Sequence, residues 1–137
     1  MTLSIEDKKT LSELRIKKAY EFLDDAKANL DEGRLRTAIN RAYYAVLNAA
    51  RALLILEGSN PETHEGIITM LSLRFIKPGL LPVQLIKNYK RLLSSRTDID
   101  YGDFDTVTTE EAEDAISVAE ETIKDMDSLR KRLLDEI

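Results

Sequence analysis

Residues 34–57 read RLRTAINRAYYAVLNAARALLILE, a run without proline or glycine that ends at Gly58. The run is long enough for roughly six to seven helical turns at about 3.6 residues per turn. Apart from one polar stripe, most positions hold Ala, Leu, Ile, Val or Tyr, and a helix that is apolar almost all round is normally buried. The sequence therefore predicts a long helix that is buried over most of its surface.

Helical patterns flank this run on both sides. Apolar residues recur at three- and four-residue steps before Gly33, and Thr108 with Glu111 forms the capping-box pattern that starts a last long helix. The other expected helices cover about 10–32 with Ser4 as an alternative start, 63–76 with Thr63 as its cap, 81–96, and the segment after Thr108. Because short links favour antiparallel neighbours, we expect an all-α fold, an antiparallel up-and-down bundle of four to five helices.

The composition limits the number of domains and the chemistry. A chain of 137 residues, 43% of them hydrophobic and 33% charged, fits a single domain spanning 1–137, and five Gly and three Pro are too few for a many-stranded β fold. The absence of Cys excludes thiol catalysis, and the single histidine, His64, excludes two-histidine metal sites within one chain. We therefore expect no metal and no cofactor.

The sequence also predicts where the protein resides. Its first twenty residues carry charges throughout, and no stretch of about 18 uncharged apolar residues occurs anywhere. These patterns predict a cytoplasmic protein with no signal peptide and no membrane partner.

The net charge of −5 conceals an asymmetry along the chain. Residues 34–96 contain 10 basic and 3 acidic residues, whereas residues 97–137 contain 4 basic and 14 acidic residues. A phosphate-bearing partner would be attracted to the basic middle despite the acidic whole. The alternative is that the acidic C-terminal segment lies alongside the basic middle and neutralises it.

The polar stripe within residues 34–57 is the first candidate site. Arginine forms bidentate hydrogen bonds with phosphate and tyrosine stacks on bases, so Arg41, Tyr44 and Arg51 are candidate nucleotide- or RNA-binding residues. The alternative is a solvated face whose arginines pair with acidic residues of the first or last helix. The whole stripe falls within an arc of about 100° on a helical wheel and consists of Arg34, Thr37, Arg41, Tyr44, Asn48 and Arg51.

The second candidate site lies at the end of the fourth expected helix. It combines Arg91 and Arg96 with Asp100 and Tyr101, and the stretch 97–108, TDIDYGDFDTVT, lacks helical periodicity and is expected to be a loop. An arginine beside carboxylates can be a functional site or an ion pair at a helix end.

The same stretch contains four aspartates, which raises the question of a metal site. It does not fit a calcium loop of the EF-hand type, because Asp103 and Thr109 stand where the turn glycine and the bidentate glutamate belong. A different metal-dependent site remains an alternative, formed by Asp98, Asp100, Asp103 and Asp105.

Three segments, taken together and in this order, resemble the HEPN family, a nucleotide-binding domain of higher eukaryotes and prokaryotes. They are Asn40–Val46 followed by Ala49–Leu54, then Thr63–Gly66, then Arg96 with Asp100–Gly102. The resemblance covers about residues 10–135 and is strongest to the small, stand-alone prokaryotic branch. It implies an antiparallel helical bundle, a homodimer, and a toxin–antitoxin pair with a minimal nucleotidyltransferase. Many members of the family are metal-independent ribonucleases.

The ribonuclease signature of that family is an arginine followed after four to six residues by a histidine. Arg96 matches the arginine, but Tyr101 occupies the place of the histidine. A phenol with a pKa of about 10 is a poor base at neutral pH. His64 is the substitute if the helix that it starts approaches Arg96, so Arg96, Tyr101 and His64 are the candidate catalytic residues.

The resemblance and the residues together lead to one functional expectation. The protein would bind RNA or a nucleotide in a cleft lined by Arg41, Tyr44, Arg96 and Tyr101, with Asp100 orienting Arg96, and would cut RNA weakly or not at all. In a variant of this expectation, Tyr101 accepts a nucleotidyl group from the partner enzyme. The competing interpretation is a non-catalytic dimeric protein-interaction module whose Arg–Asp–Tyr cluster is a structural ion-pair network.

Overall fold

A computed structural model describes the protein over residues 2–101 and 106–137, with side chains for 2–97 and 106–137. Every regular element within these residues is helical, which confirms the expected all-α fold. The elements in chain order are α1 (Ile5–Asp31), α2 (Leu35–Leu56), α3 (His64–Leu71), the π-helical turn η1 (Ser72–Ile76), α4 (Gln84–Tyr101) and α5 (Thr109–Asp135).

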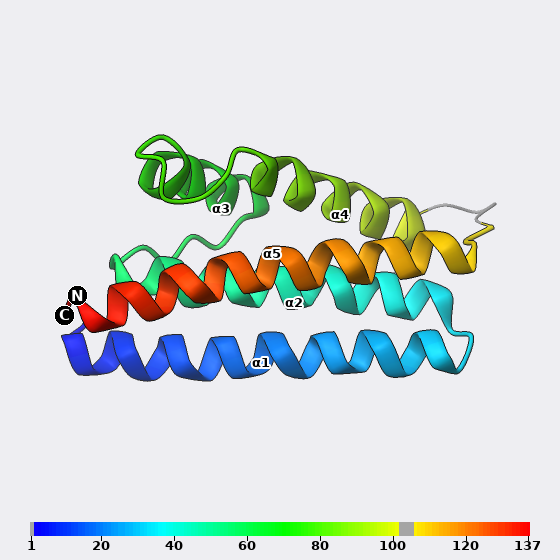
Figure 1. Cartoon of the computed structure of the whole chain (residues 1–137), viewed down its shortest axis with the longest axis horizontal. Coiled ribbons are helices and arrows are strands. Elements are labelled where there is room, and N and C mark those ends of the chain that lie inside the picture. Colours follow the sequence, from blue (N-terminus) through cyan, green and yellow to red (C-terminus); the bar gives the residue numbers. More distant parts are fainter. Residues whose placement is uncertain (1, 102–105) are drawn as a thin grey trace.

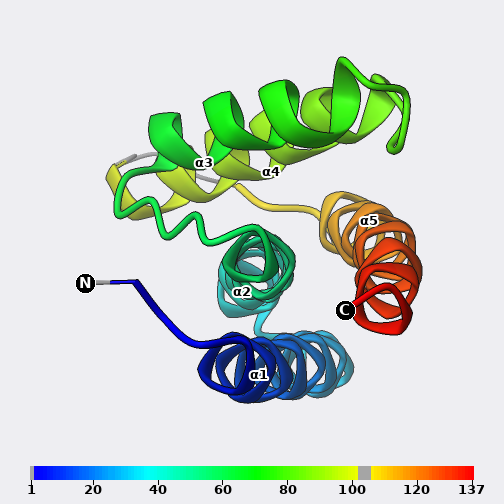
Figure 2. The same ribbon diagram turned by 90° about the vertical axis from the view of Figure 1, so that its left-hand side faces the viewer.

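The helices form an elongated bundle (Figure 1) in which both termini lie at the same end. Each long helix runs antiparallel to the long helix before it in the chain, as short connections favour. Seen along the bundle, α2 lies between α1 on one side and the α3–α4 layer on the other, with α5 beside it (Figure 2). This central position matches the apolar character of α2.

The core is built around α2. Small side chains occupy much of its buried surface, and Ala42, Ala45 and Ala49 are at most 1% exposed, so neighbouring helices can pack closely. The larger buried side chains come from several elements and include Tyr43, Leu53, Leu71, Phe75, Tyr89 and Ile123.

Side-chain caps fix the starts of α1, α3 and α5. Ser4 accepts a hydrogen bond from the Asp7 N–H, so α1 begins at the earlier of the two expected starts. The Thr108 hydroxyl likewise accepts from the Glu111 N–H at 3.1 Å, which confirms the start of α5.

The expected end of the fourth helix was wrong, and the helix expected over 63–76 contains a change of geometry. The stretch that begins at Thr97 is not a loop from its first residue, because α4 continues to Tyr101. No glycine or proline stands between Val83 and Gly102, so nothing in the sequence stops the helix earlier. The expected helix over 63–76 also changes from α-helical to π-helical geometry at Ser72.

A buried polar network joins α1 to α5. Asp127 and Arg130, each 5% exposed, form an ion pair at 2.9 Å, and Tyr20 donates a hydrogen bond to the other Asp127 oxygen at 2.7 Å. Burial alone would raise the pKa of Asp127, but the hydrogen bonds from Tyr20 and Arg130 and the charge of Arg130 bring it below its usual value. Arg130 also reaches Ser12 and Glu13, both at 3.4 Å.

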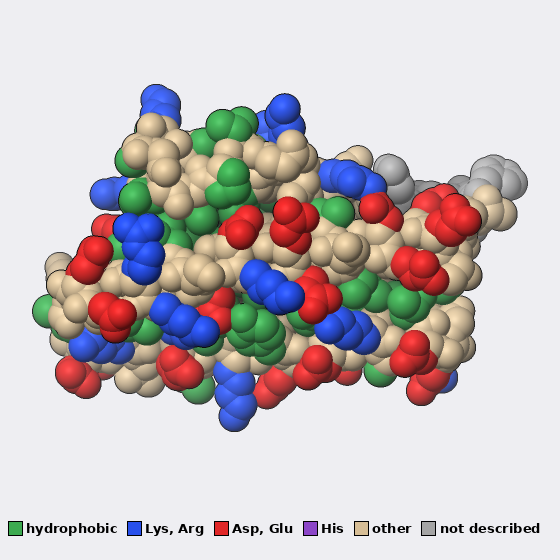
Figure 3. All heavy atoms as spheres, viewed as in Figure 1, with side chains coloured by type: hydrophobic (Ala, Val, Ile, Leu, Met, Phe, Trp, Pro, Cys, Tyr) green, Lys and Arg blue, Asp and Glu red, His purple; other side chains and the backbone are tan. Residues whose placement is uncertain are grey.

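The acidic C-terminal helix lies against the rest of the bundle and neutralises part of its positive charge. Arg91 of α4 pairs with Asp114, and Lys27 of α1 pairs with Glu120 at 3.4 Å. Acidic and basic side chains are accordingly interspersed on the face formed by α1 and α5 (Figure 3). Among the described helices none is long and apolar enough to cross a membrane.

Candidate functional site

Five side chains from α2, α3 and α4 meet in one cluster, here named the tyrosine cluster: Tyr43, Tyr44, His64, Tyr89 and Arg96. The Tyr43 hydroxyl is hydrogen-bonded to Nδ1 of His64 and lies 3.5 Å from the Tyr89 hydroxyl. Nη2 of Arg96 donates a hydrogen bond to the Tyr44 hydroxyl at 3.0 Å. The cluster therefore joins the candidate arginine and the only histidine of the chain through two adjacent tyrosines.

Local sequence explains how these side chains converge. Tyr43 and Tyr44 lie in the middle of the buried α2, whereas Tyr89 and Arg96 lie seven residues apart on α4 and so share a face of that helix. His64 is the first residue of α3 and follows Thr63, whose hydroxyl caps the helix by accepting from the Gly66 N–H at 2.9 Å. The cap fixes where the imidazole enters the cluster.

Aromatic rings surround the Arg96 guanidinium. Its Cζ atom lies 5.6 Å from the ring centroid of Tyr43 and 5.5 Å from that of Tyr44, within the range of cation–π attraction. The Tyr43 ring also packs edge-on against His64 and Tyr89. The two rings of Tyr43 and Tyr44 therefore hold the guanidinium in place.

The surroundings set the protonation state of the cluster. Partial burial, followed by the positive charge of Arg96, lowers the pKa of His64 below its usual 6.5, so the imidazole is neutral at pH 7. Burial raises the pKa of Tyr43 and of Tyr89, so both phenols stay protonated. A neutral imidazole is the form that can accept a proton.

The direction of the hydrogen bond between the Tyr43 hydroxyl and Nδ1 of His64 decides which nitrogen of His64 can accept a proton. If Tyr43 donates to Nδ1, the proton of the imidazole resides on Nε2. If Nδ1 carries the proton and donates to Tyr43, the Tyr43 hydroxyl can turn toward Tyr89, and Nε2 is left as the free acceptor. The two tautomers therefore differ by reorientation of hydroxyl protons within the cluster.

The remaining candidate residues divide into four groups. Arg51 lies on the same side of α2 as the cluster and lines a hollow with His64. Arg41 lies over the ring of Phe22 and near Asp25 of α1, and only Phe22 and Tyr44 link it to Arg96. Arg91 lies in the middle of α4 and pairs with Asp114 of α5, as described above. The side chains of Asp98, Asp100 and Tyr101 lie outside the described residues, as do Asp103 and Asp105.

The hollow beside His64 has a volume of about 150 Å³. It lies between the second half of α2, the connection that precedes α3, and α3 itself. Its lining consists of Leu47, Arg51, Pro61, Glu62, Thr63, His64 and Ile67.

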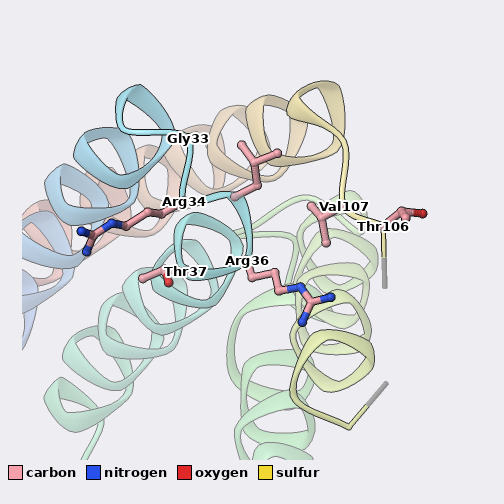
Figure 4. Close-up of a pocket in the computed structure, with 7 residues that line it drawn as sticks. Gly33, Arg34, Arg36, Thr37, Thr106 and Val107 are labelled. Atoms are coloured by element: carbon pink, nitrogen blue, oxygen red, sulfur yellow. The ribbon is translucent and has the colours of Figure 1, made fainter. Parts of the chain in front are cut away.

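A second hollow, of about 470 Å³, lies at the start of α2 and is lined by Gly33, Arg34, Leu35, Arg36, Thr37, Thr106 and Val107. Figure 4 shows that Arg34 and Arg36 point to different sides of α2 there. This hollow shares no residue with the tyrosine cluster. It is therefore separate from the site.

Among the side chains of residues 2–97 and 106–137, no group of three or more His, Asp or Glu is arranged to hold a metal ion. The aspartate-based metal site considered above depends on side chains outside that set, so it is not tested.

Sequence reasoning did not select Tyr43 or Tyr89 as site residues. Tyr43 stands four and eight residues before Leu47 and Arg51, so helical spacing could have placed it on the face that carries Arg51. Tyr89 could have been found from its seven-residue spacing to Arg96. Both are fully buried. From sequence alone, a buried tyrosine in an apolar helix cannot be distinguished from an ordinary core residue.

Comparisons with known proteins agree with this architecture. A UPF0332 protein of Thermotoga maritima is 34% identical over 116 residues, which cover 85% of this chain and 88% of the relative. A protein of Methanocaldococcus jannaschii that is named as a candidate toxin is also 34% identical over 116 residues, covering 85% and 86% of the two chains. The crystal structure of TT1696 from Thermus thermophilus shares the fold, with a TM-score of 0.73 at 21% identity over 85% of this chain and 96% of the other.

The family model for the HEPN domain matches residues 12–129. This range includes α2, α3 and α4 in full, and with them the whole tyrosine cluster. The chain therefore belongs to the HEPN domain family.

Proposed function

We propose that the protein binds RNA at the tyrosine cluster and cleaves it without a metal ion. The observation that carries this proposal is the joint placement of Arg96 and His64 around Tyr43. An arginine that retains its charge can hold a phosphate, and a neutral imidazole can accept a proton. The two groups supply the general base and the phosphate contact for metal-free RNA cleavage.

The chemistry assigns a role to each group. His64 takes the proton from a ribose 2′-hydroxyl, and the resulting oxygen attacks the adjacent phosphorus while the bond to the 5′-oxygen breaks. Arg96 stabilises the negative charge that builds on the phosphate oxygens. The leaving 5′-oxygen takes a proton, for which Tyr101 or a protonated His64 is the donor. Tyr44 positions Arg96 through its hydrogen bond.

The partners are proposed from family membership and from the names of the relatives. As in the HEPN family, the protein would form a homodimer in the cytoplasm and pair with a minimal nucleotidyltransferase. Relatives that are named as candidate toxins support a toxin role in such a pair. Transfer of a nucleotidyl group to Tyr101 by the partner would block the site and would serve as the antitoxin reaction.

The test is an RNA cleavage time course in EDTA. Wild type is compared with Arg96→Ala and His64→Ala, and with Arg74→Ala as a control, because Arg74 is exposed on η1 and lies outside the cluster. Each variant is first shown to be folded by its melting curve. We expect loss of cleavage in the first two variants only. Wild type that leaves RNA intact over hours would contradict the proposal.

One observation favours a second candidate, the non-catalytic interaction module. Arg96 is held by two tyrosines, as a purely structural arginine would be. If this is its only role, Arg96→Ala lowers the melting temperature by several degrees and leaves RNA or nucleotide binding unchanged. The functional role instead predicts reduced binding with little change in stability.

A further inference from the structure

Next to the tyrosine cluster, two arginines from different helices lie close together. Nη1 of Arg15 on α1 donates a long hydrogen bond of 3.4 Å to the backbone carbonyl of Arg51 on α2. Burial, followed by the positive charge of Arg51, lowers the pKa of Arg15 below its usual value. Neither guanidinium forms an ion pair with any carboxylate of the described residues. Two like charges thus adjoin without an acidic partner.

Arg51 also has an unsatisfied donor. Its Nε atom is buried and has no hydrogen-bond partner in the part of the chain that the structure describes. Buried donors are nearly always paired, and leaving one unpaired costs free energy. An anion bound against the Arg51 guanidinium would offset the repulsion between the two arginines, and a small shift of the side chain toward the anion would give the buried donor a partner.

The hollow of about 150 Å³ beside His64 is the space in which such an anion would fit, because Arg51 lines it. The start of α3 lies in the same lining. In its first turn the Gly66 N–H is bonded to the Thr63 side chain and the Ile67 N–H to the Thr63 carbonyl. The N–H groups of His64 and Glu65 have no partner within the helix, and such donors at a helix start favour anions.

The geometry points to a phosphate subsite in this hollow, in which Arg51 holds one phosphate group of the RNA that the tyrosine cluster acts on and the nearby charge of Arg15 adds to the attraction. The inference rests on the proposed function for RNA as the ligand. The volume corresponds to about five water molecules at roughly 30 Å³ each. Pockets for whole drug-sized ligands occupy about 300–1,000 Å³, so this hollow suits a phosphate group and not a nucleoside.

The subsite is placed to serve the same strand of RNA. Tyr43 and Arg51 are eight residues apart on α2, which corresponds to about 12 Å along the helix axis. His64 belongs to both places, since it contacts Tyr43 and lines the hollow. A strand that presents one phosphate to Arg96 can therefore present another to Arg51.

Glu62 is the one acidic side chain in the lining of the hollow. It is exposed and forms no ion pair with either arginine. Its charge opposes an incoming phosphate, so its removal should strengthen binding. This gives the subsite a test in which a variant gains affinity.

The first experiment uses inorganic phosphate as the probe. Melting temperatures are measured with rising millimolar phosphate, and sodium chloride keeps the ionic strength constant. A saturable rise is expected for wild type, a larger rise at low phosphate for Glu62→Gln, and no rise for Arg51→Gln. Arg74→Gln is the matched control and should behave like wild type. An equal rise in wild type and Arg51→Gln would overturn the subsite.

The second experiment uses single-stranded RNA with or without a 5′-phosphate, labelled at the 3′ end, and measures binding by anisotropy. Arg51→Gln should weaken binding by about tenfold and reduce the slope of log affinity against log salt by about 0.7. A loss confined to the 5′-phosphorylated strand identifies a terminal phosphate, and an equal loss with both strands identifies an internal phosphodiester; either result supports the subsite.

The two experiments separate this inference from the proposed function. RNA that binds wild type and Arg51→Gln equally overturns the subsite but leaves the role of Arg96 and His64 intact. If RNA does not bind at all, the proposed function fails. The melting experiment with inorganic phosphate still decides whether Arg51, with Arg15 beside it, forms an anion site.

Discussion

The buried ion pair between α1 and α5 allows a quantitative prediction for Asp127→Asn. The change keeps the shape of the side chain and one oxygen, but it removes the charge that faces Arg130. Both side chains are about 6–7% exposed, so the arginine would remain buried without its main partner. Breaking a buried pair from one side typically costs about 3–5 kcal/mol.

The structure places the expected cost at the lower end of that range, about 3 kcal/mol. Glu13 remains 3.4 Å from Nη1 of Arg130 and supplies a partial substitute for the lost charge. For a chain of 137 residues, an unfolding entropy of about 2.1 cal/mol/K per residue gives about 0.29 kcal/mol/K for the whole protein. The loss should therefore lower the melting temperature by about 10 °C.

The assay is urea unfolding at pH 7 together with thermal melts. Asp125→Asn is the matched control, because Asp125 is exposed on the same helix and should change stability by less than about 0.5 kcal/mol. The pKa of Asp127 is lowered in the folded state, so its stabilisation is complete above the unfolded pKa of about 3.9 and is lost as pH falls through the folded pKa. A loss below about 1 kcal/mol at pH 7, or one that does not shrink toward low pH, would refute the reasoning.

Three further predictions concern helix starts and the histidine. Thr108→Ala removes the cap of α5 and should cost about 1 kcal/mol in urea unfolding, whereas Thr109→Ala should be nearly neutral; equal effects would contradict the cap. Gly66→Ala should lower stability, because the added Cβ would lie 2.9 Å from the Thr63 hydroxyl that caps α3. Alanine in a helix usually stabilises by about 1 kcal/mol relative to glycine, so a higher melting temperature would count against this clash. Because the pKa of His64 is lowered in the folded state, the unfolded chain binds the proton more readily, so wild type should lose stability as pH falls from about 6.5 through the lowered value. His64→Gln should lack that loss in urea titrations at pH 5 to 7.5, and parallel curves would show that the environment does not shift the imidazole.

The sequence predicted the number of helices and most of their ends because those features depend on local chemistry. Ser4 and Thr108 are caps whose effect reaches three residues, and both act as expected. The end of α4 was missed because the Asp-rich sequence after Arg96 was interpreted as a loop, although Gly102 is the first residue there with poor helix propensity.

The candidate site was predictable only in part, because its geometry depends on how the helices pack. The sequence identified Arg96 and His64 separately, and their meeting at Tyr43 required α3 and α4 to lie on the same side of α2. The buried pair of Asp127 and Arg130 gave no signal, since a charged pair three residues apart on a helix is usually exposed. Likewise, Arg15 was not selected, because only packing of α1 against α2 brings it to Arg51.

The acidic residues of the chain do not lie next to all of its arginines. The acidic residues that follow Arg96 in sequence are concentrated in α5, which packs beside α2 and pairs with exposed cations such as Lys27 and Arg91. Within the residues whose side chains the structure describes, no carboxylate lies at ion-pair distance from Arg51 or Arg15. The net charge of the chain is −5, yet the residue that lines the hollow beside His64 with a buried donor is an arginine, Arg51. If RNA binds at Arg51 as proposed, the acidic whole repels it at long range while the arginine attracts it at contact, so raising the salt concentration should weaken the repulsion as well as the binding.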